Sequence, residues 1–114
     1  MTLREKQSLF AVLVARLIQH ATGLGYEVTF GEAWRSPEEA ARLATAGKGI
    51  TASLHVHRLA IDLNLFQDGI YLSSSESHRP LGEWWERQHA LTRWGGRFRK
   101  PDGNHYSLAH GGRQ

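Results

Sequence analysis

The sequence lacks cysteine altogether, and it has no long apolar run. Without cysteine there is no disulfide, no cysteine-based zinc finger and no cysteine nucleophile, and the redox compartment stays open. The most apolar stretch, LFAVLVARLI at 9–18, is shorter than the roughly 20 residues that a membrane-spanning helix needs, and Arg16 interrupts it. No small-residue cleavage site follows it. We therefore expect neither membrane insertion nor a signal peptide.

Dense clusters of positive charge are also absent, although the chain is basic overall. The formal net charge is +3 and the isoelectric point is about 9.7. Only RFRK at 97–100 is rich in lysine and arginine, and it is short. A mild positive balance suits an anionic partner, such as nucleic acid, an acidic membrane or the anionic bacterial cell wall. Because no extended basic patch exists, we expect no nucleic-acid partner.

The length and composition predict one folded domain. The chain has 114 residues, of which 40% are hydrophobic and 22% are charged. These values are ordinary for a globular protein and allow one core but not two. We expect residues 1–114 to form a single domain that works as a monomer.

Apolar residues recur at helical spacing in three places. The first predicted helix covers residues 3–22, where Thr2 and Glu5 are spaced as in a capping box. Two further helices are predicted over residues 37–46 and 81–94. Trp84 and Trp85 lie in the last of these, where one ring is expected in the core and the other at the rim of a cleft.

Strand patterns lie between the predicted helices. Residues 26–30 alternate as a half-buried strand that we extend to Trp34, and residues 58–66 are predicted to pair with 70–72 in a hairpin. Short strands are expected in GGRF and NHYSLA, around the turn KPDG. The remaining segments are predicted as the loop GKGITAS, the loop SSSESHRP and a frayed end, HGGRQ. This order predicts an α+β fold with a small antiparallel sheet flanked by helices, because the connections are too short for repeated parallel crossovers.

One carboxylate lies inside the apolar segment SLHVHRLAIDLNL (residues 53–65). Asp62 stands between Ile61 and Leu63, and an uncompensated buried charge there would cost several kcal/mol. A positive neighbour is therefore expected. Arg58 is one candidate, although four residues along a strand place it about 13 Å away. A metal ion is the other.

Histidines near Asp62 favour the metal. In a protein without cysteine, a catalytic zinc ion is held by three histidine or carboxylate ligands and keeps one open position. His55 belongs to the same segment as Asp62, and the turn DGNH brings Asp102 close to His105. Each pattern alone is weak, because a lone histidine is more often a surface or core residue. Together they indicate that His55, Asp62 and His105 could hold a metal, with Asp102 transferring protons.

The segment resembles a known signature. Ser53, His55, Ala60 and Asp62 match the pattern S-x-H-x-x-[GR]-x-A-x-D of the zinc D-Ala-D-Ala carboxypeptidases, the related dipeptidases and the phage L-alanyl-D-glutamate endopeptidases. The form RLA-x-DLNL is similar to the phage-type branch. DGNH matches the second motif of that group, an acidic residue three before a histidine. AWRSPEEAARL and WGGRF resemble its upstream arginine segment and its tryptophan-glycine segment.

This resemblance implies a fold and a site. The fold would be the small α+β fold that these peptidases share with the Hedgehog signalling domain. His55, Asp62 and His105 would be the ligands of Zn²⁺, Asp102 the general base and acid, and Arg35 a clamp for the oxyanion or for a substrate carboxylate. Ser53 would support a ligand or contact substrate.

Five histidines fall outside this ligand set. His57 could support a ligand, contact substrate or do neither. The other four are expected at the surface: His20, His78, His89 and His110.

The resemblance also implies a function. We expect a zinc metallopeptidase that hydrolyses the peptidoglycan stem peptide, first as an L-alanyl-D-glutamate endopeptidase and second as a D,D- or L,D-carboxypeptidase or dipeptidase. No separate cell-wall-binding domain is visible. Such an enzyme would be made in the cytoplasm and reach the wall through a holin during phage or prophage lysis.

Two other classes of protein stay open. One is a non-catalytic zinc-containing binding module of the same fold, against which Asp102 argues. The other is a basic nucleic-acid-binding domain, which would bind without a metal and with a steep salt dependence.

Overall fold

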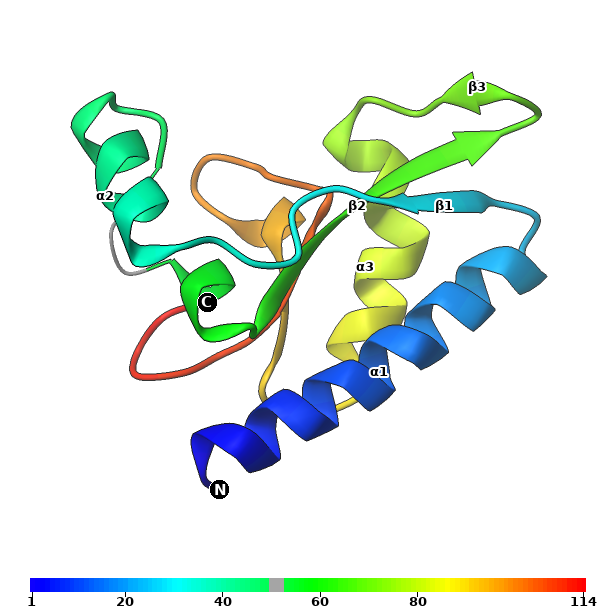
Figure 1. The fold of residues 1–114 in the computed structure, drawn as a ribbon. Coiled ribbons are helices and arrows are strands. Elements are labelled where there is room, and N and C mark those ends of the chain that lie inside the picture. The colour runs from blue at the N-terminus through cyan, green and yellow to red at the C-terminus, as the bar shows by residue number, and fades with distance from the viewer. Residues whose placement is uncertain (50–52) are drawn as a thin grey trace.

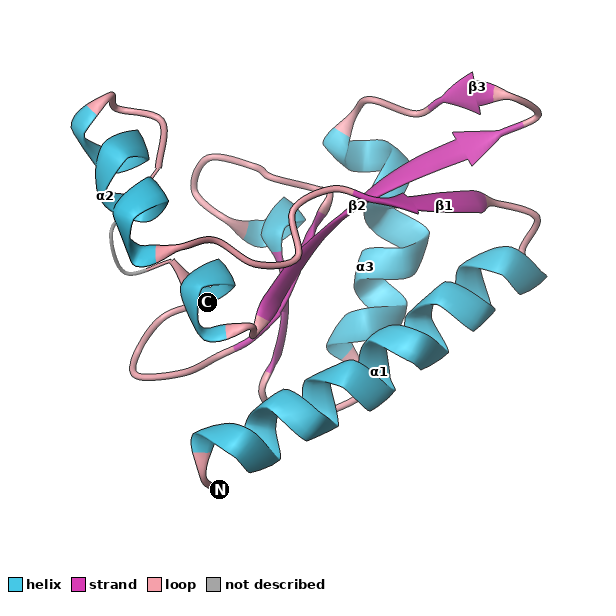
Figure 2. Ribbon diagram, in the orientation of Figure 1, coloured by secondary structure: helices cyan, strands magenta, loops and turns pink. Residues whose placement is uncertain are grey.

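A computed structural model describes residues 1–49 and 53–114. These residues contain three α-helices and five strands, and every strand pair among them is antiparallel. Figure 2 shows the helices around the small sheet, and the α+β prediction is confirmed. The predicted loop GKGITAS lies partly outside the described residues. Within the described part of the chain, no helix is long and apolar enough to span a bilayer.

Helix α1 (Leu3–Gly23) forms as predicted. Thr2 accepts a hydrogen bond from the Glu5 amide, and the Glu5 carboxylate accepts one from the Thr2 amide. One face of α1 is buried and packs against β1, α3 and β5. The buried residues of this face are Phe10, Leu13, Val14, Leu17 and Ala21.

The sheet is built on strand β2 (Ala60–Gln67). It pairs with β1 (Glu27–Phe30), with the short β3 (Ile70–Tyr71) and with β5 (His105–Leu108), which in turn pairs with β4 (Thr92–Trp94). In Figure 1, α1 and α3 (Arg79–Glu86) lie on one side of this sheet, whereas α2 (Pro37–Thr45) stands apart at the other end of the molecule.

Successive side chains of β2 point to opposite faces of the sheet: one face packs in the core, and the other carries Asp62 and its neighbours. Ile61, Leu63 and Leu65 join the hydrophobic core, which also takes in side chains from α1, α3 and β5. Asp62 and Asn64 point to the opposite face and are half-buried. The strand that carries Asp62 is therefore anchored in the core by the residues on either side of it.

Two predicted strand boundaries and two predicted element types differ from the structure. The first strand ends at Phe30 rather than Trp34: Gly31 and Glu32 still bond to the backbone of Asp62, but the Arg35 amide bonds to the His55 carbonyl outside the sheet. The second begins at Ala60 rather than residue 58: the preceding residues form a 3₁₀ helix, η1 (Leu54–His57), and Arg58 takes a left-handed conformation with φ of 57°. The predicted loop SSSESHRP contains a 3₁₀ helix, η2 (Ser75–His78). GGRF begins with another, η3 (Gly95–Arg97), rather than a strand.

The third predicted helix is too long. It ends at Glu86, and residues 92–94 instead form β4. Trp85 Nε1 donates to the carbonyl oxygens of Arg93 and Ser107 at 3.0 and 3.2 Å, which ties this helix to β4 and β5. Trp85 is fully buried, as expected for one of the pair. Trp84 stacks on His20 at 4.6 Å between ring centres, so it does not line the cleft.

Two further expectations are corrected. His78 is buried rather than at the surface, and its Nδ1 lies 2.8 Å from the Tyr106 hydroxyl. The last residues are not frayed, because His110 and Arg113 exchange two backbone hydrogen bonds.

Candidate active site

The sheet brings Asp62 and His105 together. They are direct cross-strand partners on β2 and β5, so both side chains project from the same face. The Asp62 Oδ1 atom lies 3.6 Å from His105 Nδ1. This juxtaposition joins two sequence segments that are more than forty residues apart.

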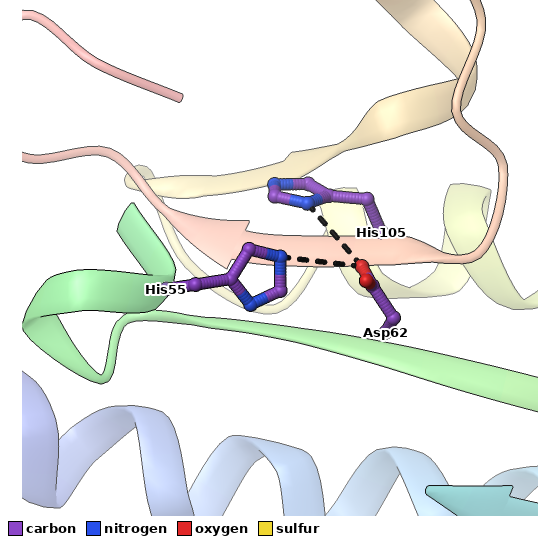
Figure 3. Close-up of side chains that lie close together, drawn as sticks. All are labelled: His55, Asp62 and His105. Atoms are coloured by element: carbon purple, nitrogen blue, oxygen red, sulfur yellow. Dashed lines mark ion pairs between the residues drawn. The ribbon is translucent and has the colours of Figure 1, made fainter. Parts of the chain in front are cut away.

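His55 reaches the same point from η1. The Ser53 hydroxyl accepts a hydrogen bond from the His55 amide at 3.3 Å and so caps this short helix. His55 Nε2 then lies 3.4 Å from Asp62 Oδ1. Figure 3 shows the two imidazole rings converging on the Asp62 carboxylate.

These three side chains fit a metal ion. One ligand atom of each of His55, Asp62 and His105 lies within 4.8 Å of the others. The Asp62 Oδ1 atom is buried and has no hydrogen-bond partner among the described residues. Burial would raise the pKa of Asp62, but interactions with His105 and His55 outweigh it and lower this pKa to about 2. An ionised carboxylate between two imidazoles is the donor set of a zinc site with an open position.

Asp102 lies beside this cluster in the turn before β5. Its Oδ2 atom is 3.9 Å from His105 Nδ1, and half of the side chain is exposed. Burial and the nearby Asp62 charge raise the pKa of Asp102 above its usual range. Asp102 can therefore reach both the cluster and solvent, as a group that carries protons must.

The turn that carries Asp102 is tightly fixed. The Gly103 carbonyl accepts from Trp94 Nε1 at 2.7 Å, and the Gly103 amide donates to the Ser75 hydroxyl at 2.9 Å. The Asp102 amide donates to the Gly95 carbonyl at 2.9 Å. Trp94, in the predicted tryptophan-glycine segment, is thus buried in the core and supports the turn.

Arg35 and Ser53 both line the pocket around the cluster. This pocket has a volume of about 250 Å³, and its wall also includes Lys48, Phe98 and Arg113. Arg58 is elsewhere: its guanidinium stacks over the Trp34 ring at 4.8 Å, which excludes it as the partner of Asp62.

His57 is not among the residues that line this pocket. Its ring lies 5.4 Å from that of His110, and its carbonyl oxygen accepts from Gln7. The substrate contact considered for His57 has no support in this geometry.

Comparison with known proteins places the chain in a family. A profile of the D-alanyl-D-alanine carboxypeptidase family matches residues 46–108, which is more than half of the chain and includes His55, Asp62 and His105. The chain belongs to this family of peptidases.

A solved structure shares the fold of this peptidase. The L-Ala D-Glu endopeptidase ChiX of Serratia marcescens superimposes with a TM-score of 0.70 at 22% sequence identity. The alignment covers 87% of this chain and 79% of that one. No curated protein matches the sequence. The fold expected from the sequence resemblance is therefore confirmed.

One charged residue of this peptidase site was missed by sequence reasoning. Glu32 follows β1, and its Oε1 atom lies 2.5 Å from Arg35 Nη2 and 3.6 Å from His55 Nδ1. The available signal was its place three residues before Arg35. That spacing is unremarkable in a segment predicted as strand, and only the loop after Phe30 places the Glu32 carboxylate between Arg35 and His55.

Proposed function

We propose that this peptidase is a zinc enzyme that hydrolyses the stem peptide of bacterial peptidoglycan, with the L-alanyl-D-glutamate bond as its first candidate. The observation that carries the proposal is the convergence of His55, Asp62 and His105, with Asp102 beside them. Membership of a zinc-dependent peptidase family supports the same metal. The phage-type form of the motif favours the endopeptidase and a role in phage lysis.

The residues present account for the steps of peptide hydrolysis. His55, Asp62 and His105 would hold a zinc ion, which would supply Lewis-acid activation of water and of the scissile carbonyl. Asp102 accepts the proton of the water whose oxygen attacks the carbonyl carbon. It then returns this proton to the leaving amine as the C–N bond breaks. Arg35 offers its charge to the developing oxyanion.

The positively charged side chains in the pocket wall support the proposal of an acidic substrate. Lys48 and Arg113 line it together with Arg35, and neither of these two has an ion-pair partner among the described residues. Cations around a reaction centre favour peptides that carry carboxylates close to the cleaved bond. A D-glutamate residue in the stem peptide carries such a group.

A D,D-carboxypeptidase is the second candidate. The family description favours it, and the same cations could hold a terminal carboxylate. A non-catalytic module is less well supported, since Asp102 is present and reaches both solvent and the cluster.

Mass spectrometry of digested cell walls distinguishes these activities. Purified protein is incubated with Gram-negative sacculi in the presence of zinc or of a chelator, and the released fragments are weighed. We expect zinc-dependent release of peptides that begin at the acidic residue. Loss of only a terminal D-alanine would identify the carboxypeptidase, and an unchanged wall with zinc bound would rule out this substrate.

A further inference from the structure

The segment between β1 and α2 is joined by its backbone to two of the metal ligands. The Gly31 amide donates to the Asp62 carbonyl at 2.8 Å, and the Asp62 amide donates to the Glu32 carbonyl at 2.9 Å. The Arg35 amide donates to the His55 carbonyl at 3.2 Å. These three bonds tie the backbone of the segment directly to that of His55 and Asp62.

The Glu32 side chain occupies the space between His55 and Arg35. Its Oε1 atom is buried, 2.5 Å from Arg35 Nη2 and 3.6 Å from His55 Nδ1. His55 Nδ1 is also buried and has no hydrogen-bond partner among the described residues. The two nitrogens of the His55 ring thus face different carboxylates, Nε2 towards Asp62 and Nδ1 towards Glu32.

We propose that Glu32 is a positioning residue that fixes both His55 and Arg35 for the reaction. A metal-binding histidine usually donates its second N–H to a carboxylate or carbonyl, which sets the ring tautomer and increases the basicity of the ligand nitrogen. Glu32 is the carboxylate that faces His55 Nδ1. Attraction to this carboxylate, 3.6 Å away, favours the tautomer with the proton on Nδ1, which leaves Nε2 free to bind metal.

The same carboxylate orients Arg35. The side chain of Arg35 is only 14% exposed, so its charge needs a partner, and Glu32 supplies one. Because one carboxylate lies against both groups, the His55 ring and the Arg35 guanidinium that lines the pocket are held in one fixed relation. Glu32 itself lies on the Nδ1 side of the ring, away from the metal cluster, and is not a ligand.

Zinc affinity tests this inference, which rests on the proposed zinc site. Metal-free wild-type protein, Glu32→Gln and Glu32→Ala are titrated with zinc against a chromophoric chelator. We expect the affinity to fall about tenfold in Glu32→Gln and up to about 100-fold in Glu32→Ala. Glu27→Gln on β1 is the matched control, because Glu27 is exposed and has no ion pair among the described residues, and it should bind zinc as wild type does.

A second readout separates positioning from a loss of folding. Nitrogen-15 spectra of the histidine rings in the zinc-bound wild-type protein should show His55 protonated on Nδ1, and this signal should shift or broaden in Glu32→Ala. At saturating zinc, peptide hydrolysis by Glu32→Gln should still be slower than wild type, because Arg35 has lost its partner. Equal zinc affinity and unchanged His55 spectra in all variants would overturn the inference. If the wild-type protein bound no zinc, the proposed function would fail instead.

Discussion

At the scale of single residues, Asp102 is the group whose loss should separate metal binding from catalysis. Asp102→Asn removes the proton acceptor but leaves His55, Asp62 and His105 in place. We expect hydrolysis to fall by about 10²–10⁴-fold while one zinc still binds per chain. Parallel measurements of turnover and of bound zinc check this, and a fully active Asp102→Asn would show that Asp102 has another role.

The positively charged side chains of Lys48 and Arg113 in the pocket wall should increase the affinity for substrate. Lys48→Gln and Arg113→Gln each remove one charge from the pocket wall. Because both side chains are exposed, each charge should contribute about 1 kcal/mol, which corresponds to a three- to tenfold rise in KM with little change in kcat. The assay uses a stem peptide with a free D-glutamate carboxylate. For the amidated form of this peptide, the rise in KM should be much smaller. Lys100→Gln, which lies outside the pocket, is the control; equal effects on both peptides would contradict a role in recognising the carboxylate.

His78 should make stability depend on pH. Burial lowers the pKa of His78 from its ordinary 6.5 to about 4, so the folded protein keeps this ring neutral while the unfolded chain protonates it below about pH 6.5. Stability attributable to His78 is therefore complete above pH 6.5, and it is lost as the pH falls towards 4 by up to about 3 kcal/mol.

Urea unfolding of the wild-type protein and of His78→Gln at pH 7.5 and pH 5 measures this contribution. Glutamine can still bond to the Tyr106 hydroxyl but does not titrate. The loss of stability between the two pH values should be smaller in the variant. If both proteins lost the same amount, burial of His78 would not be its source.

At the scale of elements, the close approach of Gly95 to the Asp102 turn is a structural requirement. A Cβ atom on residue 95 would overlap the Asp102 carbonyl oxygen and lie 2.8 Å from the Cβ of His105. Gly95→Ala should therefore displace the turn and cost about 1–3 kcal/mol of stability, with weaker zinc binding.

Gly23→Ala provides the comparison for this substitution. Apart from the neighbouring residues and the backbone of α1 itself, no atom of the described residues lies within 4 Å of a Cβ at Gly23, which ends α1. Alanine there should leave zinc binding unchanged and stabilise the helix by up to about 1 kcal/mol. Chelator competition and urea unfolding on both variants test the difference, and a Gly95→Ala protein with wild-type zinc affinity would contradict it.

Local signals predicted some elements well. The capping box at Thr2 and Glu5 and the Ser36–Pro37 start gave two helices correctly, because caps and apolar spacing act within one or two turns. The hairpin of β2 and β3 follows from its short turn for the same reason.

Tertiary contacts decided the elements that were predicted wrongly. Residues 92–94 have a helical pattern in sequence, yet they pair with β5 and bury Trp94, whose Nε1 bonds to Gly103. The signature residues of the site could be identified by resemblance to known motifs. Glu32 could not, because its role depends on how residues 31–35 fold back onto β2 and η1.

At the scale of the whole molecule, the two faces of the sheet have different roles: one packs in the hydrophobic core and the other carries the candidate site. One face of β2 carries the core against α1, α3 and β5, and the other presents Asp62 beside His105 and η1. The family profile covers residues 46–108, so Glu32 and Arg35 enter the site from outside the matched region. The β1–α2 segment is joined to the cluster by the backbone hydrogen bonds of Gly31, Glu32 and Arg35.

The central claim is that one zinc ion at His55, Asp62 and His105 makes this chain a peptidase. The most direct test is to titrate metal-free protein with zinc and to measure bound zinc and hydrolysis of a stem peptide in the same samples. Our account predicts that both rise together and level off at one zinc per chain, and that His105→Ala shows neither. Hydrolysis that is complete without zinc, or that persists in His105→Ala, would contradict it.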